Sequence, residues 1–145
     1  MNRISKENYY LDIAETVLER ATCLRRIYGA IIVKNDEIIS TGYNGAPRGR
    51  ANCVDMGYCS REAMKVPRGE RYELCRSVHA EANAITKVAK SANNCDGSTL
   101  YITAAPCIEC SKLIIQAGIK RVVYCEEYRS EEGLDLLRKV GIECV

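Results

Sequence analysis

Three features that mark whole classes of protein are missing from this chain or scarce in it. No apolar run is long enough to cross a bilayer, and residues 1–7 lack the apolar core of a secretory signal. The net charge is only +2 and no long basic block occurs, which argues against a nucleic-acid-binding surface. We therefore expect a cytoplasmic protein with neither a membrane nor a nucleic-acid partner.

Histidine is also scarce, with a single residue, whereas cysteine is abundant, with nine. Thiols stay reduced in the cytosol, so metal ligation explains this odd count better than a disulfide framework. The chain has 145 residues, of which 47% are hydrophobic and 28% charged. These values are typical of a soluble globular protein, and we expect one domain spanning residues 1–145.

Hydrophobic periodicity predicts helices that alternate with strands. Apolar residues at helical spacing predict a first helix at 5–26, with Ser5 as its N-cap. Two β-rich stretches separated by a turn-like segment predict a hairpin. The expected strands are 29–33, 38–43, 99–103, 121–125 and 142–145. The expected later helices are 80–92, 106–118 and 131–140, with Pro106 as first helical residue and Gly118 just past the end.

The order of these elements predicts an α/β fold. Alternating helices and strands in the second half favour parallel pairing there, while the leading hairpin supplies an antiparallel pair. We therefore expect a three-layer α/β/α sandwich around a mixed sheet of about five strands. Residues 50–78 show little periodicity and carry three cysteines. Because long irregular segments inside a compact domain are usually functional or tied down, we interpret this stretch as a cysteine-bearing insert.

Two short motifs carry the chemistry. Residues 79–81 read H-x-E and residues 106–110 read P-C-x-x-C, which together form the signature of zinc-dependent nucleobase deaminases. Catalytic zinc sites have three protein ligands and an open position for water, and His79, Cys107 and Cys110 supply such a set. Glu81 lies two residues beyond the histidine, where it can move protons for the water. We predict that it is the catalytic residue.

Each motif alone has an ordinary explanation. A lone histidine at a helix start is most often a simple polar residue. A lone C-x-x-C motif also occurs as a thioredoxin-like redox pair or as half of a structural zinc site. The combination of both motifs, each at the predicted start of a helix, favours a catalytic zinc.

Longer stretches resemble the deoxycytidylate (dCMP) deaminases, within the cytidine and deoxycytidylate deaminase superfamily. The resemblance covers nearly the whole chain and rests on residues 42–49, 75–85 and 106–112. The zinc motifs indicate only the superfamily, whereas the Gly-Tyr-Asn-Gly-x-Pro stretch and the insert indicate the dCMP branch. The resemblance implies hydrolysis of dCMP to dUMP and ammonia, which supplies dUMP for thymidylate synthesis. It also implies, for many members, a homohexamer activated by dCTP with Mg2+ and inhibited by dTTP.

The resemblance further implies roles for individual residues. Asn44 corresponds to an asparagine that binds the sugar, with a turn residue before glycine as the alternative. Arg25 is assigned to the 5′-phosphate, with a solvated helix charge as the alternative. Tyr124 and Tyr128 are assigned to the nucleotide pocket, with plain packing as the alternative, and Ala80 is assigned to the base through its backbone.

Two further sites are hypotheses from the same resemblance. Some members, notably phage ones, hold a second, structural zinc in the insert region, and its ligands here would be Cys23, Cys53, Cys59 and Cys75. The alternative is that some of these are simply buried thiols. An effector nucleotide could bind the Gly/Pro-rich stretch, although a turn has the same letters. The residues of that effector site would be Asn44, Gly45, Pro47 and Gly49.

Other functions remain open from the sequence. One is a deaminase of the same superfamily acting on cytidine, guanine or a tRNA adenosine, but those branches generally lack this cysteine-bearing insert. Another is a nucleotide-binding or DNA-uptake accessory protein that keeps the zinc fold without turnover. The presence of Glu81 argues against the latter, because a non-catalytic relative can dispense with it.

Overall fold

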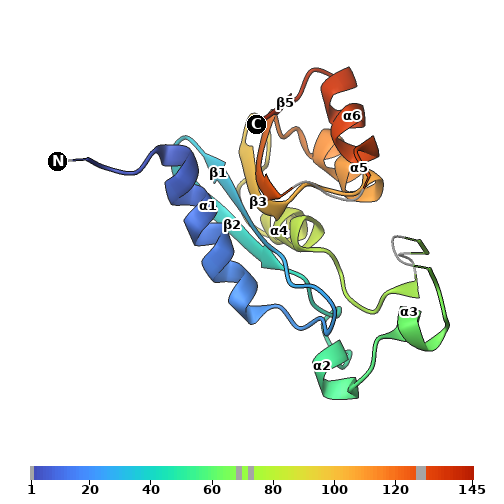
Figure 1. Ribbon diagram of the computed structural model, residues 1–145. Coiled ribbons are helices and arrows are strands. Elements are labelled where there is room, and N and C mark those ends of the chain that lie inside the picture. Colours follow the sequence, from blue (N-terminus) through green and yellow to red (C-terminus); the bar gives the residue numbers. More distant parts are fainter. Residues whose placement is uncertain (1, 68–69, 72–73, 127–129) are drawn as a thin grey trace.

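The computed structural model describes residues 2–67, 70–71, 74–126 and 130–145 (Figure 1). Its centre is a five-stranded sheet in the order β2-β1-β3-β4-β5. Strand β1 pairs antiparallel with both β2 and β3, whereas β3, β4 and β5 run parallel. The predicted mixed sheet is therefore confirmed. The strands are β1 (Gly29–Lys34), β2 (Glu37–Tyr43), β3 (Thr99–Ala104), β4 (Arg121–Glu126) and β5 (Glu143–Cys144).

The predicted hairpin joins β1 to β2 through a two-residue turn. Asn35 and Asp36 have φ angles of 53° and 61°. Such left-handed pairs match the twist of antiparallel strands, and Asn and Asp tolerate this conformation better than other side chains. The turn also receives Tyr10 from the first helix, whose hydroxyl donates to the Asp36 carboxylate.

The first helix starts as predicted but ends early. Helix α1 (Lys6–Val17) begins after Ser5, whose Oγ accepts a hydrogen bond from the Asn8 N–H at 3.1 Å. The helix tightens into a 3₁₀ turn, η1 (Leu18–Arg20), and the chain then becomes extended at Ala21. The prediction of a helix up to residue 26 is wrong, so both Cys23 and Arg25 lie in a loop.

The loop that follows η1 gains its hydrogen bonds from the end of β2 instead of from a helix. The Thr22 N–H donates to the Asn44 carbonyl at 3.1 Å. The Asn44 side chain then accepts from the Tyr28 N–H and donates to the Arg26 carbonyl, both at 2.8 Å. These long-range bonds satisfy backbone groups that a continued helix would have paired locally.

The helices that carry the two motifs start at the metal-ligand candidates. Helix α4 (Ala80–Ala89) has His79 as its N-cap residue, and α5 (Ile108–Ala117) has Cys107. Pro106 therefore precedes the N-cap, and its prediction as the first helical residue is wrong. Gly118 ends α5 in the left-handed conformation with φ 85°, as expected for a helix C-terminus. The last helix is α6 (Glu132–Lys139).

The helices cover both faces of the sheet, which confirms the three-layer α/β/α sandwich (Figure 1). Successive strand residues point to opposite faces, so each strand contributes to two cores. On one face α1 packs against the residues Ile31, Val33, Tyr101 and Val123. On the other, α4, α5 and α6 pack against Ala30, Ile32, Leu100, Ile102 and Val122.

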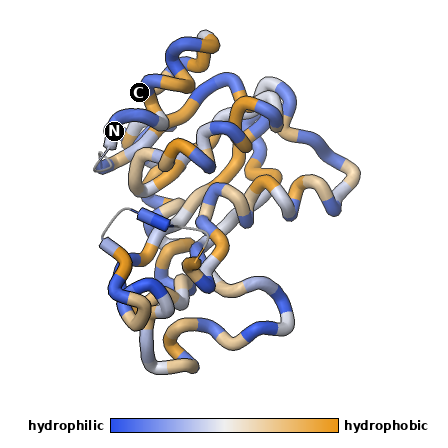
Figure 2. Tube along the Cα trace, turned by 90° about the vertical axis from the view of Figure 1, so that its right-hand side faces the viewer, coloured by the Kyte–Doolittle hydropathy of each residue, from blue (hydrophilic) through white to orange (hydrophobic). Residues whose placement is uncertain are grey.

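The cysteine-bearing insert extends beyond the sheet (Figure 1) and includes two one-turn helices, α2 (Cys53–Met56) and α3 (Ser60–Ala63). The sequence did not predict these helices, because four residues are too few to show periodicity. Among the described residues, neither hydrophobic core cluster includes a member of the insert. Seen from the side of the insert (Figure 2), the segment mixes hydrophilic and apolar residues. Within the described ranges, no helix combines the length and apolarity needed to cross a membrane.

Candidate metal centre

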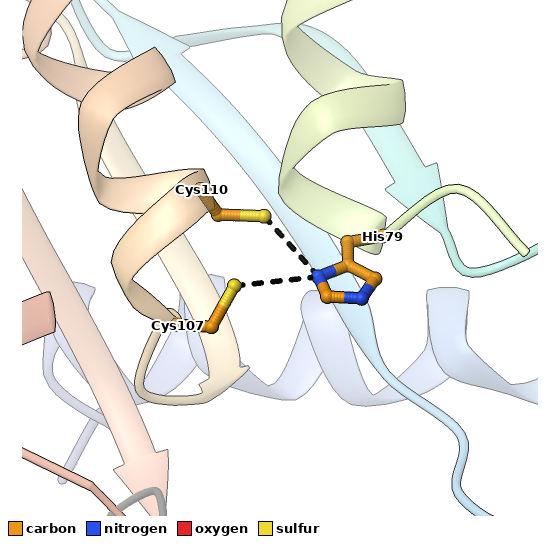
Figure 3. Close-up of side chains that lie close together, drawn as sticks. All are labelled: His79, Cys107 and Cys110. Atoms are coloured by element: carbon orange, nitrogen blue, oxygen red, sulfur yellow. Dashed lines mark hydrogen bonds between the residues drawn. The ribbon is translucent and has the colours of Figure 1, made fainter. Parts of the chain in front are cut away.

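The two motifs meet at the starts of neighbouring helices (Figure 3). His79 Nδ1 lies 3.3 Å from Cys110 Sγ and 3.6 Å from Cys107 Sγ. Within the part of the chain that the structure describes, these residues are the only group of three or more metal-ligand candidates whose ligand atoms all lie within 4.8 Å of one another. Both cysteines are buried and the histidine is partly buried. The site predicted from the motifs is therefore assembled in the structure.

The donor set and its spacing fit zinc. One imidazole nitrogen and two thiolate sulfurs are typical of catalytic zinc sites. A tetrahedral zinc with bonds of about 2.0 Å to nitrogen and about 2.3 Å to sulfur separates those donors by roughly 3.5 Å. The observed separations of 3.3 Å and 3.6 Å lie on either side of this value. His79, Cys107 and Cys110 would thus hold the metal with little rearrangement.

Comparison with known proteins agrees with this site. The protein-family model of the cytidine and deoxycytidylate deaminase zinc-binding region matches residues 4–126. The chain belongs to this family. The deoxycytidylate deaminase of Mycobacterium phage D29 is 41% identical, over 88% of this chain and 99% of its own. That of Enterobacteria phage T4 is 35% identical, over 95% and 88%.

A solved structure extends the similarity to three dimensions. The dCMP deaminase of cyanophage S-TIM5, determined in complex with dCMP and dUMP, is 38% identical and superimposes with a TM-score of 0.81. The match covers 99% of this chain and 98% of that one. The resemblance stated from the sequence is confirmed, and the insert lies within the matched length.

The two thiols of this deaminase-family site differ in acidity because they are hydrogen-bonded to each other. The Cys110 thiol donates to Cys107, which lowers the pKa of Cys107 to about 4, and the His79 imidazole adds to this effect. The same hydrogen bond raises the pKa of Cys110. Burial lowers the pKa of His79, but the hydrogen bond to Cys107 and the charge of Glu81 outweigh it. Cys107 is therefore the first of the two thiols to ionise, and thiolate is the form that binds a metal.

Glu81 lies in the first turn of α4 and is only 5% exposed. Burial raises the pKa of its carboxyl to about 7, although the nearby His79 charge works in the opposite direction. A proton-transfer group is most effective when its pKa is near the working pH. The carboxyl thus has the position and the acidity of a general acid–base residue beside the metal site.

Two glycines allow close packing behind the ligands, and sequence reasoning missed both roles. A Cβ at Gly42 of β2 would lie 2.3 Å from the Ala80 carbonyl in the first turn of α4. A Cβ at Gly133 of α6 would lie 2.3 Å from the Pro106 carbonyl, directly before Cys107. Neither contact would be possible with a side chain, so these glycines set how closely β2 and α6 approach the metal-binding turns. Such a role depends on tertiary neighbours and leaves no local pattern.

Asn44 and Arg25, which the resemblance assigns to the nucleotide, have protein partners in the structure. Asn44 is 4% exposed, and its amide holds the loop at Arg26 and Tyr28. One amide N–H and one acceptor lone pair are left, so the sugar role stays a prediction. Arg25 Nε pairs with Glu62 of α3 at 2.9 Å, which ties the loop to the insert.

Three further residues were assigned to the nucleotide by the resemblance: Ala80, Tyr124 and Tyr128. Ala80 is fully buried against Gly42, with its backbone in the first turn of α4. Tyr124 is half-buried and packs against the core cluster formed with α4 and α5. Tyr128 lies outside the described residues, so its assignment stays a prediction.

The second group of cysteines gathers around Cys53. Burial raises the pKa of the Cys53 thiol, and the charges of Cys23, Cys75 and Cys59 raise it further. Cys53 and Cys59 are buried, and the other two are partly buried. Their ligand atoms do not form a group as compact as the His79 group. The four cysteines predicted to bind a structural zinc thus lie near one another, but their sulfur atoms are not all within 4.8 Å of one another.

Proposed function

We propose that this protein hydrolyses dCMP to dUMP with release of ammonia. The observation that carries the proposal is the buried Glu81 beside the ligand set of His79, Cys107 and Cys110. This arrangement matches the roles of glutamate and zinc in the nucleobase deaminases. The choice of dCMP is supported by the two phage relatives named deoxycytidylate deaminase, which align with most of the chain.

The protein residues divide the chemistry between them. Zinc, when bound, would act as a Lewis acid and lower the pKa of a bound water molecule to roughly 7. Glu81 accepts a proton from the attacking water and delivers protons to the ring nitrogen and to the leaving ammonia. Burial raises the pKa of this carboxyl above its usual range, which suits a group that both accepts and donates protons.

The first experiment compares ammonia release from dCMP and from free deoxycytidine. A dCMP deaminase should lose most of its activity without the phosphate, because the binding energy of that group contributes to the rate. Equal activity on both substrates would favour a cytidine deaminase of the same superfamily. Turnover of neither by the zinc-loaded protein would contradict the proposal and point to another base or to a non-catalytic nucleotide-binding protein.

Regulation by dCTP with Mg2+ and by dTTP, and assembly into a homohexamer, are part of the same proposal. Of the four effector residues, Pro47 and Gly49 are exposed, while Asn44 and Gly45 are buried at the end of β2. An effector would therefore contact the exposed residues directly before the insert. Ammonia release should increase when dCTP and Mg2+ are added and decrease with dTTP, and light scattering should give six chains. Rates that ignore both nucleotides would indicate an unregulated enzyme.

A structural zinc bound by Cys23, Cys53, Cys59 and Cys75 is the last part of the proposal. The charges of the other three thiols act on the buried Cys53, and none of the four residues belongs to the core clusters described above. Folded, unstripped protein should contain two zinc ions per chain. Cys59→Ser should reduce this number to one, whereas Cys144→Ser at the far edge of the sheet should leave it at two. One zinc per wild-type chain would contradict this site.

A further inference from the structure

The insert leaves and rejoins the sandwich through a narrow neck. Gly45, after the end of β2, and Val78, before α4, form an isolated antiparallel bridge. The Gly45 N–H donates to the Val78 carbonyl at 3.2 Å, and the Val78 N–H donates to the Gly45 carbonyl at 2.7 Å. Val78 directly precedes His79. The neck is therefore one peptide bond away from a metal ligand.

Asn83 closes this neck from inside α4. Its side-chain Nδ2 donates to the Tyr43 carbonyl at 2.7 Å and to the Val78 carbonyl at 3.2 Å. Its backbone N–H donates to the His79 carbonyl at 2.9 Å. A side-chain amide has two N–H groups, and both are used here. One residue thus joins the end of β2, the end of the insert and the backbone of the metal ligand.

We propose that Asn83 is a positioning residue that sets the place of His79 relative to Cys107 and Cys110. The place of the imidazole depends on the backbone at residues 78–79, and the Asn83 side chain holds the carbonyl of the peptide that joins Val78 to His79. Outer-shell residues that orient metal ligands typically change metal affinity by about 10–100-fold when they are replaced. The inference rests on metal binding at this site and not on which nucleotide is deaminated.

Substitutions at position 83 separate the hydrogen bonds from the size of the side chain. Asn83→Asp has nearly the same shape, but it replaces both N–H groups with an acceptor that faces two carbonyl oxygens. Asn83→Leu removes both side-chain hydrogen bonds without adding charge. Asn94→Asp is the matched control, because it adds the same charge at an exposed site. There Oδ1 only accepts hydrogen bonds, from Lys34 Nζ at 2.7 Å and from the Asp96 N–H at 3.0 Å.

The decisive measurements are made on the metal and not on turnover. Zinc affinity is measured by competition with a chelator, and ligand geometry by the visible absorption of the cobalt-substituted protein. Thermal unfolding of the metal-free chain measures stability separately. We expect Asn83→Asp and Asn83→Leu to bind zinc about 10–100-fold more weakly and to shift the cobalt bands. The Asn94→Asp variant should match the wild type in both measurements.

Wild-type cobalt bands in a folded Asn83→Asp variant would overturn the proposal, even if zinc affinity fell, because a loss of stability alone would then explain the effect. If the Asp variant does not fold, Asn83→Leu decides, since it removes both side-chain N–H groups without adding a charge. Shifted cobalt bands in that variant support the positioning role, and unshifted bands overturn it. An inactive wild-type protein with normal metal binding would contradict the dCMP proposal while leaving this test intact.

Discussion

Glu81 is buried two residues beyond the candidate metal ligand His79, and burial raises the pKa of its carboxyl to about 7. Glu81→Gln keeps the size and removes the ability to transfer protons. We expect the variant to retain its zinc and its unfolding temperature but to lose activity on dCMP by roughly 10²–10⁴-fold or more, as for other general acid–base residues. Metal content, thermal unfolding and ammonia release measure the three effects. Undiminished activity would remove Glu81 from the mechanism.

Arg25 has two possible roles that a pair of variants can separate. The structure shows an ion pair with Glu62, whereas the family resemblance assigns Arg25 to the substrate phosphate. If it binds phosphate, Arg25→Ala should raise the KM for dCMP about tenfold or more, because a charge-assisted hydrogen bond contributes roughly 1.5–3 kcal/mol. Glu62→Gln removes the ion pair but keeps the guanidinium, so its KM should change little. An unchanged KM in Arg25→Ala would rule out the phosphate role.

At the scale of single residues, the sequence predicted the groups whose chemistry is encoded locally. The spacing of His79, Glu81, Cys107 and Cys110 is a short-range pattern, and the fold brings the three ligands together as expected. Asn83 and Gly133 could not be predicted in this way. Their roles depend on carbonyl groups of other elements, at Tyr43 and at Pro106. The available hint was a polar Asn within an apolar helix, which suggests a specific hydrogen bond.

At the scale of elements, the types were easier to predict than the ends. Apolar periodicity continues past Val17, so the first helix was predicted to reach residue 26. The helix ends earlier because the following loop forms its hydrogen bonds with Asn44. Tyr28, for example, bonds to Asn44 across a sequence separation of 16 residues. Pro106 was likewise placed inside α5, although Cys107 is the N-cap. Both errors concern boundaries that tertiary contacts decide.

Helix α1 is tied to the β1–β2 turn by a pH-sensitive contact. The hydrogen bond to Asp36, together with burial, raises the pKa of Tyr10 from 10.0 to about 12. A raised pKa means that the folded state binds this proton more tightly, so its contribution to stability is complete below pH 10 and is lost as the pH rises toward 12. Tyr10→Phe should therefore differ from the wild type in unfolding temperature at pH 9 and much less at pH 11.5. A difference that stays constant over this range would contradict the role of Tyr10.

At the scale of the whole molecule, the sandwich and the insert are separable in structure but meet at the metal site. The hydrophobic cores of the described chain draw on the sheet and on helices α1, α4, α5 and α6. The insert contacts the rest through a few polar links, including the Arg25–Glu62 ion pair and the Thr22–Asn52 hydrogen bond. Because the neck lies next to His79, the insert joins the sandwich directly beside the candidate metal site.

This division predicts that the insert can be removed without loss of the fold. Gly45 and Val78 are directly opposed in an antiparallel bridge, so residues 46–77 can be replaced by a two-residue Asn-Gly turn, which suits such pairs. We expect the shortened chain to unfold cooperatively and to bind one metal ion, held by His79, Cys107 and Cys110. It should no longer distinguish dCMP from deoxycytidine, because the insert that the family resemblance links to the dCMP branch is gone.

Calorimetry, metal analysis and ammonia release from the two substrates test the shortened chain. Cys107→Ser in the same background is the control, and it should abolish the remaining metal binding. A shortened chain that aggregates, or that folds without binding metal, would show that the insert supports the core or orients His79 in ways that the neck alone does not provide. Retained discrimination between dCMP and deoxycytidine would instead place phosphate recognition in the sandwich itself, where the loop at residues 21–28 would be the part to examine.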